Sequence, residues 1–242
     1  MSCERTVTAR WRSTSNRAAS SCGPAAVAPD TIGPMTIPDR RTAARLLLSL
    51  EPGDWFLRHA CVVADIAGWL AHAASTRGAV VNVRLVEAAA LLHDIDKLPA
   101  VHVNDHLRHG EGSAAWLTDH GLAELAPVVR DHPVTRLAED EFAGWASAAS
   151  LEARIVAYAD KRGGQHLESM SDRFASWRHR YPPGSGVQVK RTGKAAWSEE
   201  TMQLVEKRAR DLERSVCRAA GVRPEEVRRL RWSRRALREA AR

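Results

Sequence analysis

The sequence predicts an all-α protein, a bundle of helices with histidines and aspartates gathered near its centre. Apolar residues recur at three- and four-residue steps through most of the chain, which is the period of an amphipathic helix. No segment alternates apolar and polar residues as a half-buried strand does, and no unit of about 20 to 50 residues repeats. The chain has 242 residues, 44% of them hydrophobic and 27% charged, which is enough to bury a core and excludes a wholly disordered or fibrous protein.

The helices follow from this period and from the glycines and prolines that interrupt it. The segment 83–93 is apolar almost all round, which is typical of a helix at the centre of an all-helical domain. The segment 57–76 has one apolar stripe, and His59 lies on it. The predicted helices are 40–50, closed by Pro52; 57–76; 83–93; 108–120, ended by Gly121; 122–132, stopped by Pro133; 151–160 and 166–180, separated by Gly163 and Gly164; 198–219, broken by Gly221; and a short arginine-rich helix that finishes the chain.

Charge is distributed unevenly along the chain. Residues 190–242 hold 16 Lys and Arg against 8 Asp and Glu, a balance of +8, whereas residues 35–189 hold 16 against 19, a balance of −3. All ten histidines fall between residues 59 and 179. This division predicts chemistry in the middle of the chain and an electrostatic accessory at its basic end.

The cysteines and the apolar runs indicate the redox environment of the protein and its relation to membranes. The four cysteines lie far apart, which argues against a disulfide scaffold or a cysteine-built zinc site and favours a reducing, cytoplasmic environment. No apolar run approaches the roughly 18 to 20 residues that span a bilayer, so we expect no membrane partner.

Six inward-facing polar residues carry the functional signal. A single histidine on an apolar face usually bonds a backbone carbonyl, and a single buried aspartate is often a helix cap. Burying several imidazoles and carboxylates together is costly unless something compensates them, and a divalent cation does so. Mixed imidazole and carboxylate ligands suit first-row ions such as iron, manganese or zinc. The six residues are His59, His93, Asp94, His109, His132 and Asp160.

Three segments resemble the HD-domain metal-dependent phosphohydrolases, named for an adjacent His-Asp pair. They are His59, the sequence Ala-Leu-Leu-His-Asp-Ile-Asp-Lys over 90–97, and Ala-Asp-Lys over 159–161, and the resemblance covers about residues 40–180. It implies a helical bundle with a central metal site. The implied ligands are His59, His93, Asp94 and Asp160, joined by His109 and His132 in the branch with dinuclear sites, where Asp94 would bridge two ions.

Two alternatives remain open at this level. His106 could replace His109 as a ligand, although the small residues after His109 favour His109. One ion could be bound instead of two, with Fe, Mn, Co, Ni and Zn as the candidate metals. The chain also departs from the family pattern, because Asp96 stands where glycine usually follows His-Asp-Ile and adds a carboxylate near the site.

The resemblance implies hydrolysis of a phosphoester or phosphoanhydride bond by metal-activated water. The substrate would be a phosphorylated small molecule, in particular a nucleotide or dinucleoside polyphosphate. Asp94 and Lys97 are the candidate catalytic residues, with Lys97 as a phosphate clamp. Lys161 and Arg162 are weaker candidates for substrate binding, and Trp116 and Trp177 are candidates for lining a base pocket.

We therefore expect a disordered N-terminal extension over 1–38, an HD phosphohydrolase domain over 39–181, a linker over 182–197 and a basic helical C-terminal extension over 198–242. The alternative function is a non-enzymatic regulatory or RNA-binding protein that uses the basic extension around Trp232 for nucleic-acid contact. The opposing interpretation is an arginine-rich helix that covers the core. The apolar stripe of the helix 198–219 predicts either packing within the chain or a homodimer.

Overall fold

The computed structural model describes residues 37–104, 106–142, 144–185 and 196–242. Within these ranges the chain forms helices and no strand, with one isolated bridge between Gly163 and Leu167, so the predicted all-α class is confirmed. The α-helices are α1 (Arg40–Ser49), α2 (Asp54–Thr76), α3 (Val83–Leu92), α4 (Glu111–Asp119), α5 (Ala126–Val129), α6 (Trp145–Ala148), α7 (Leu151–Arg162), α8 (Met170–Arg180), α9 (Glu199–Ala220) and α10 (Trp232–Ala240). Short 3-10 helices are η1 (Ile95–Lys97), η2 (Val134–Ala138), η3 (Asp140–Phe142) and η4 (Pro224–Glu226).

Side-chain caps begin several of these helices. Ser150 Oγ accepts the backbone N–H of Ala153 at 3.1 Å at the start of α7, and Ser198 caps α9 in the same way. The predicted helix over 122–132 is wrong in extent, since only the single turn α5 is α-helical there. Pro127 lies in its first turn, where it lacks an N–H and fits only the start of a helix.

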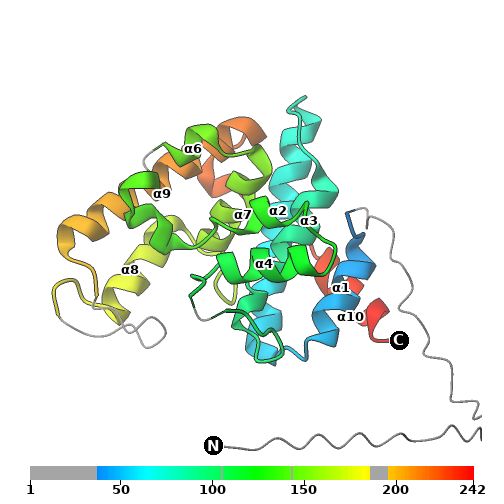
Figure 1. The fold of residues 1–242 in the computed structure, drawn as a ribbon. Coiled ribbons are helices and arrows are strands. Elements are labelled where there is room, and N and C mark those ends of the chain that lie inside the picture. The colour runs from blue at the N-terminus through cyan, green and yellow to red at the C-terminus, as the bar shows by residue number, and fades with distance from the viewer. Residues whose placement is uncertain (1–36, 105, 143, 186–195) are drawn as a thin grey trace, which may run out of the picture. The chain divides into compact units, whose positions relative to one another are not determined.

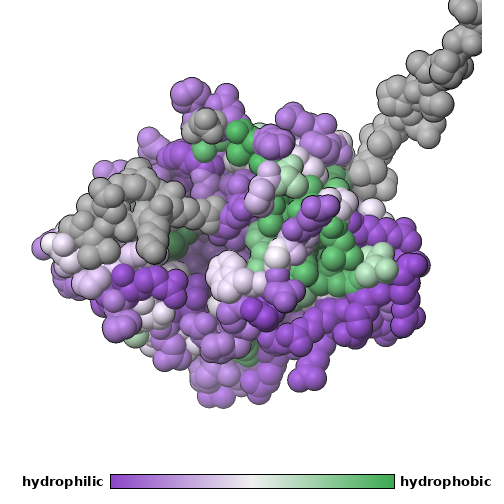
Figure 2. All heavy atoms as spheres, turned by 90° about the horizontal axis from the view of Figure 1, so that it is seen from below, coloured by the Kyte–Doolittle hydropathy of each residue, from purple (hydrophilic) through white to green (hydrophobic). Residues whose placement is uncertain are grey.

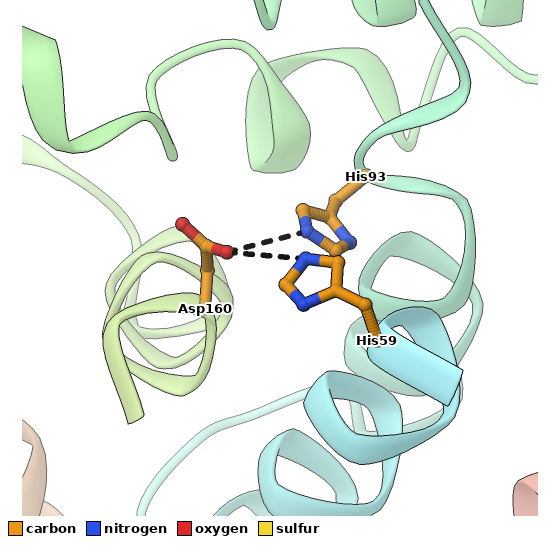
Figure 3. Close-up of side chains that lie close together, drawn as sticks. All are labelled: His59, His93 and Asp160. Carbon is orange, nitrogen blue, oxygen red and sulfur yellow. Dashed lines mark ion pairs between the residues drawn. The ribbon is translucent and has the colours of Figure 1, made fainter. Parts of the chain in front are cut away.

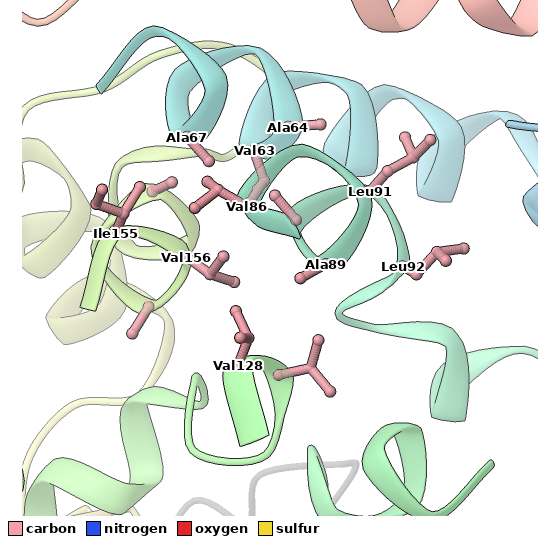
Figure 4. Packing of buried hydrophobic residues seen from close by; sticks show 14 of the residues in the cluster. Val63, Ala64, Ala67, Val86, Ala89, Leu91, Leu92, Val128, Ile155 and Val156 are labelled. Atoms are coloured by element: carbon pink, nitrogen blue, oxygen red, sulfur yellow. The ribbon is translucent and has the colours of Figure 1, made fainter. Parts of the chain in front are cut away.

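The core is built around α2 and α3, which pack against each other and against α7. Figure 4 shows side chains from α2, α3, α5 and α7 meeting in one apolar cluster. Many of them are alanine and valine, which lets the helices approach closely. The labelled members are Val63, Ala64, Ala67, Val86, Ala89, Leu91, Leu92, Val128, Ile155 and Val156.

The C-terminal helices pack on this core. Val205, Leu212 and Val216 of α9 are buried in the same cluster, where α9 contacts α2 and α7. The helix α10 lies beside α1, although the two are far apart in sequence (Figure 1). The apolar stripe of α9 is thus used within the chain, and the arginine-rich end covers the core. A homodimer and a separate extension over 198–242 stay predictions.

The predicted disordered segment 1–38 and linker 182–197 fall mostly in residues 1–36 and 186–195, outside the described residues. Among the residues that are described, no helix has the length and apolar character needed to cross a membrane. Hydrophilic side chains dominate the face shown in Figure 2 and surround one hydrophobic area.

Candidate metal centre

Five helix faces or ends bring the six predicted residues together. Each sits where a helix begins, ends or turns inward, so the backbone fixes its direction. The residues are His59 on α2, His93 and Asp94 directly after α3, His109 before α4, His132 after α5 and Asp160 near the end of α7. All of them except His109 and Asp160 are buried.

The Asp94 carboxylate lies between two pairs of histidines. Its Oδ2 atom is 3.2 Å from His59 Nε2 and 3.6 Å from His93 Nε2. Its Oδ1 atom is 3.1 Å from His109 Nε2 and 3.2 Å from His132 Nε2. Each oxygen therefore faces its own pair of imidazole nitrogens, which is the arrangement of a carboxylate that bridges two sites.

Asp160 completes one of the two groups. Its Oδ1 atom lies 3.5 Å from both His59 Nε2 and His93 Nε2 (Figure 3). Figure 3 shows these three side chains converging from α2, from the end of α3 and from α7. The donor atoms of His59, His93 and Asp160 lie within 4.8 Å of one another, as do those of His93, Asp94 and His132.

The second ring nitrogen of each histidine has its own acceptor. Nδ1 of His93 lies 2.8 Å from the Ala90 carbonyl, and Nδ1 of His132 lies 2.6 Å from the Val129 carbonyl. Nδ1 of His59 faces the Gly164 carbonyl at 3.4 Å. Because a carbonyl only accepts, Nδ1 carries the proton in the neutral ring and Nε2 keeps its lone pair toward the centre.

His109 differs, because its Nδ1 partner is the Asp96 carboxylate, at 3.0 and 2.9 Å from the two oxygens. Asp96 Oδ2 also accepts the Gly110 backbone N–H at 2.8 Å, and the Asp96 N–H donates to Ser113 Oγ at 3.1 Å. Gly110 has φ 87°, and a Cβ there would lie 2.4 Å from a backbone oxygen of Arg130, so the turn requires glycine.

Asp96, which stands where the family pattern has glycine, thus orients His109 and holds the turn before α4. The structure also separates the two candidate histidines. His109 contacts Asp94 and Asp96, whereas His106 is exposed and its ring has no partner among the described residues.

Burial and ion pairing set the charge of the centre. Burial would raise the pKa of Asp94, but Lys97 and His93 beside it hold that pKa well below its usual range. Burial would lower the pKa of His59, but its contacts with Asp160 and Asp94 raise it to about 9. Burial lowers the pKa of His132 to about 4. The Asp94 carboxylate is therefore charged at neutral pH, and a carboxylate attracts cations.

A divalent ion fits these residues. His93 Nε2 is buried and has no hydrogen-bond partner. Burying this nitrogen costs free energy unless an ion accepts its lone pair. The donors are imidazole nitrogens and carboxylate oxygens without a thiolate, a set that suits first-row divalent ions. The two cysteines of the described residues, Cys61 and Cys217, are buried elsewhere and free.

Lys161 and Arg162 are buried and bond to other groups of the protein, and their contact with a substrate stays a prediction. Lys161 is 1% exposed and donates to the carbonyls of His132 and Ala157. Arg162 is 5% exposed and pairs with Glu213. Lys161 thus holds the carbonyl of His132, a residue of the centre, whereas Arg162 connects α7 to α9.

Trp55 contacts a residue of the centre, which the sequence analysis missed. Its ring stacks on His59 with 5.9 Å between centroids and 18° between planes. The spacing of four residues on one helix was the available signal. Trp116 instead stacks on His120, and Trp177 packs against Phe174.

An all-α domain has a His-Asp pair at its centre, and one comparison with known proteins bears on this part of the chain. Residues 56–162 match the family model of the HD domain, so the chain contains an HD domain there, as its motifs indicated. The match spans all six residues of the centre. No curated protein and no solved structure matches the chain significantly.

Proposed function

We propose that this protein is a phosphohydrolase that binds two divalent first-row ions (Fe, Mn, Co, Ni or Zn) and cleaves a phosphoester or phosphoanhydride bond. The substrate we propose is a nucleotide or a dinucleoside polyphosphate. One observation carries the proposal: the two oxygens of the Asp94 carboxylate face different histidines. Each oxygen lies near its own pair of histidine Nε2 atoms.

The proposed ligands form two sets that share Asp94. One set is His59, His93, Asp94 and Asp160, and the other is Asp94, His109 and His132. When bound, such ions supply an activated water and neutralise the phosphate oxygens as charge develops. The carbonyls and the Asp96 carboxylate behind the histidines hold the Nε2 atoms in position before any ion arrives.

Lys97 is the proposed phosphate clamp. It lies in η1, three residues after Asp94, and its ammonium group bonds Asp94 Oδ2. Its side chain is 21% exposed, so it faces both the centre and solvent. We propose that Lys97 and Asp94 are the catalytic residues, with Lys97 binding the phosphate oxygens that enter from solvent.

A substrate panel tests this function. Protein reconstituted with Mn²⁺, Fe²⁺ or Co²⁺ would be assayed for hydrolysis of nucleoside monophosphates, deoxynucleotides, guanosine tetraphosphate and diadenosine tetraphosphate. We expect metal-dependent turnover of at least one of them and its loss in Asp94→Ala. Retention of activity in Asp94→Ala, or inactivity on every nucleotide, would contradict the proposal.

The alternative of an RNA-binding protein has less support. Trp232, its candidate stacking residue, is 7% exposed, and the Arg40 guanidinium lies 5.0 Å from its ring centroid. A ring covered in this way cannot stack on a base. Arginines of α10 remain exposed, so any RNA affinity should come from charge alone and fall steeply with salt.

A further inference from the structure

Trp55 lies on the surface next to the centre, and nothing assigned so far uses it. Its exposed fraction is 60%, and the other exposed large hydrophobic residues of the described chain are Val80 and Leu107. Tryptophan is usually largely buried, because its ring removes more apolar surface from water than other side chains do. A tryptophan left in solvent beside a reactive centre is therefore a candidate contact for a ligand.

The Trp55 ring lies against the imidazole of His59, which carries one of the proposed ligand atoms. It stacks on His59, whose Nε2 atom faces Asp94 and Asp160. Trp55 is therefore close enough to contact the rest of a substrate whose phosphate is bound by ions at His59, Asp94 and Asp160.

The backbone around Trp55 is tied to the loop that follows α7. Gln165 Nε2 donates to the Trp55 carbonyl at 3.2 Å, and Arg58 Nε donates to Gln165 Oε1 at 2.8 Å. The remaining guanidinium nitrogens of Arg58 have no ion-pair partner within the described ranges. This corner thus presents an exposed aromatic ring on a held backbone, and the guanidinium near it has no ion-pair partner within the described ranges.

We propose that Trp55 binds the base of a nucleotide substrate by stacking. This inference rests on the proposed function and assigns the residue that would recognise the base of its nucleotide substrate. Any of the planar bases can stack on an indole ring, and the interaction is strong enough to change affinity by about 10- to 100-fold.

The test compares two ligands that share a phosphate and differ in the base. Binding of adenosine 5′-phosphate and of ribose 5-phosphate to the metal-loaded protein would be measured by titration calorimetry, which does not require turnover. We expect Trp55→Ala to weaken binding of adenosine 5′-phosphate by about 10- to 100-fold and leave ribose 5-phosphate unchanged. Trp55→Phe should restore most of the affinity, and Val80→Ala, at an exposed apolar site elsewhere, should change neither.

Other outcomes overturn the inference. Equal affinity of the wild type for both ligands, or equal loss for both in Trp55→Ala, would show that the ring does not bind the base. Metal content of Trp55→Ala, measured in parallel, separates loss of stacking from displacement of His59. Base-dependent binding without hydrolysis would keep this inference and remove the proposed function.

Discussion

The Asp96 carboxylate lies 2.9 Å from Nδ1 of His109, whose Nε2 lies 3.1 Å from Asp94 Oδ1. A carboxylate, an imidazole and a central carboxylate thus form one chain of contacts. Carboxylates behind metal-binding histidines fix the ring and raise its basicity. Burial would raise the pKa of Asp96, but the hydrogen bond from His109 lowers it, so the carboxylate is charged at neutral pH.

Replacing Asp96 should remove the ion on the His109 side and leave the other. We expect Asp96→Ala to bind about one ion per chain, against an expected two in the wild type, with activity reduced about 10- to 100-fold. Metal content by mass spectrometry checks this, with Asp119→Ala, an exposed aspartate on α4, as the control. Two ions in Asp96→Ala would show that His109 needs no partner.

Replacing Lys97 should slow turnover without loss of metal. Because its ammonium group contacts Asp94 at the solvent side of the centre, we expect Lys97→Met to lower kcat by about 100-fold. Lys97→Arg should recover part of the activity, since the charge remains. A variant with normal kcat would mean that Lys97 is only a solvated helix-end residue.

The stability of the protein should depend on Asp65 in a pH-dependent way. Burial raises the pKa of Asp65, only partly offset by the Ser233 N–H, and Oδ2 has no partner in the described chain. A carboxyl with a raised pKa favours the folded state at low pH and loses that contribution as pH rises through its folded pKa.

We therefore expect Asp65→Asn to raise the free energy of unfolding by about 1 kcal/mol at pH 7, where more of the wild-type carboxyl is ionised than at low pH. The gain should be smaller near pH 4.5. Urea titrations at the two pH values measure it, with the exposed Asp119→Asn as the control. A gain that grows toward low pH would contradict the assigned direction.

The helix α9 should contribute to the stability of the core. Leu212 is 1% exposed and lies in the common core, so Leu212→Ala should lower the free energy of unfolding by about 3 kcal/mol. Arg214→Ala, two residues away on the exposed side, should change it by about 0.5 kcal/mol or less. Similar effects of the two variants would mean that α9 is a loosely attached arm.

Helix positions were predictable wherever the apolar pattern was long. The stripe over 57–76 and the apolar run over 83–93 match α2 and α3 within a few residues, because burial of one face decides both the pattern and the helix. The prediction of a helix over 122–132 was wrong in extent, since apolar residues also line turns and Pro127 restricts the helix to one turn.

The candidate ligands were predictable because each stands on an inward face or at a helix end. Their neighbours were not, since which side chain meets which is set by packing between distant segments. Lys161 was a weaker candidate for substrate binding on the sequence, but packing between distant segments buries it, and this burial lowers its pKa to about 8. The exposure of Trp55 likewise follows from which helices cover α2, information that a local pattern does not contain.

The most direct test of the two-ion centre is metal content per chain, measured by mass spectrometry on protein purified without a chelating tag, for the wild type, Asp94→Ala and His109→Ala. The proposed ligand sets predict about two first-row ions in the wild type, one in His109→Ala and loss of both in Asp94→Ala. A wild-type protein that binds no ion after reconstitution, or an Asp94→Ala variant that keeps two, would contradict a two-ion centre that shares Asp94.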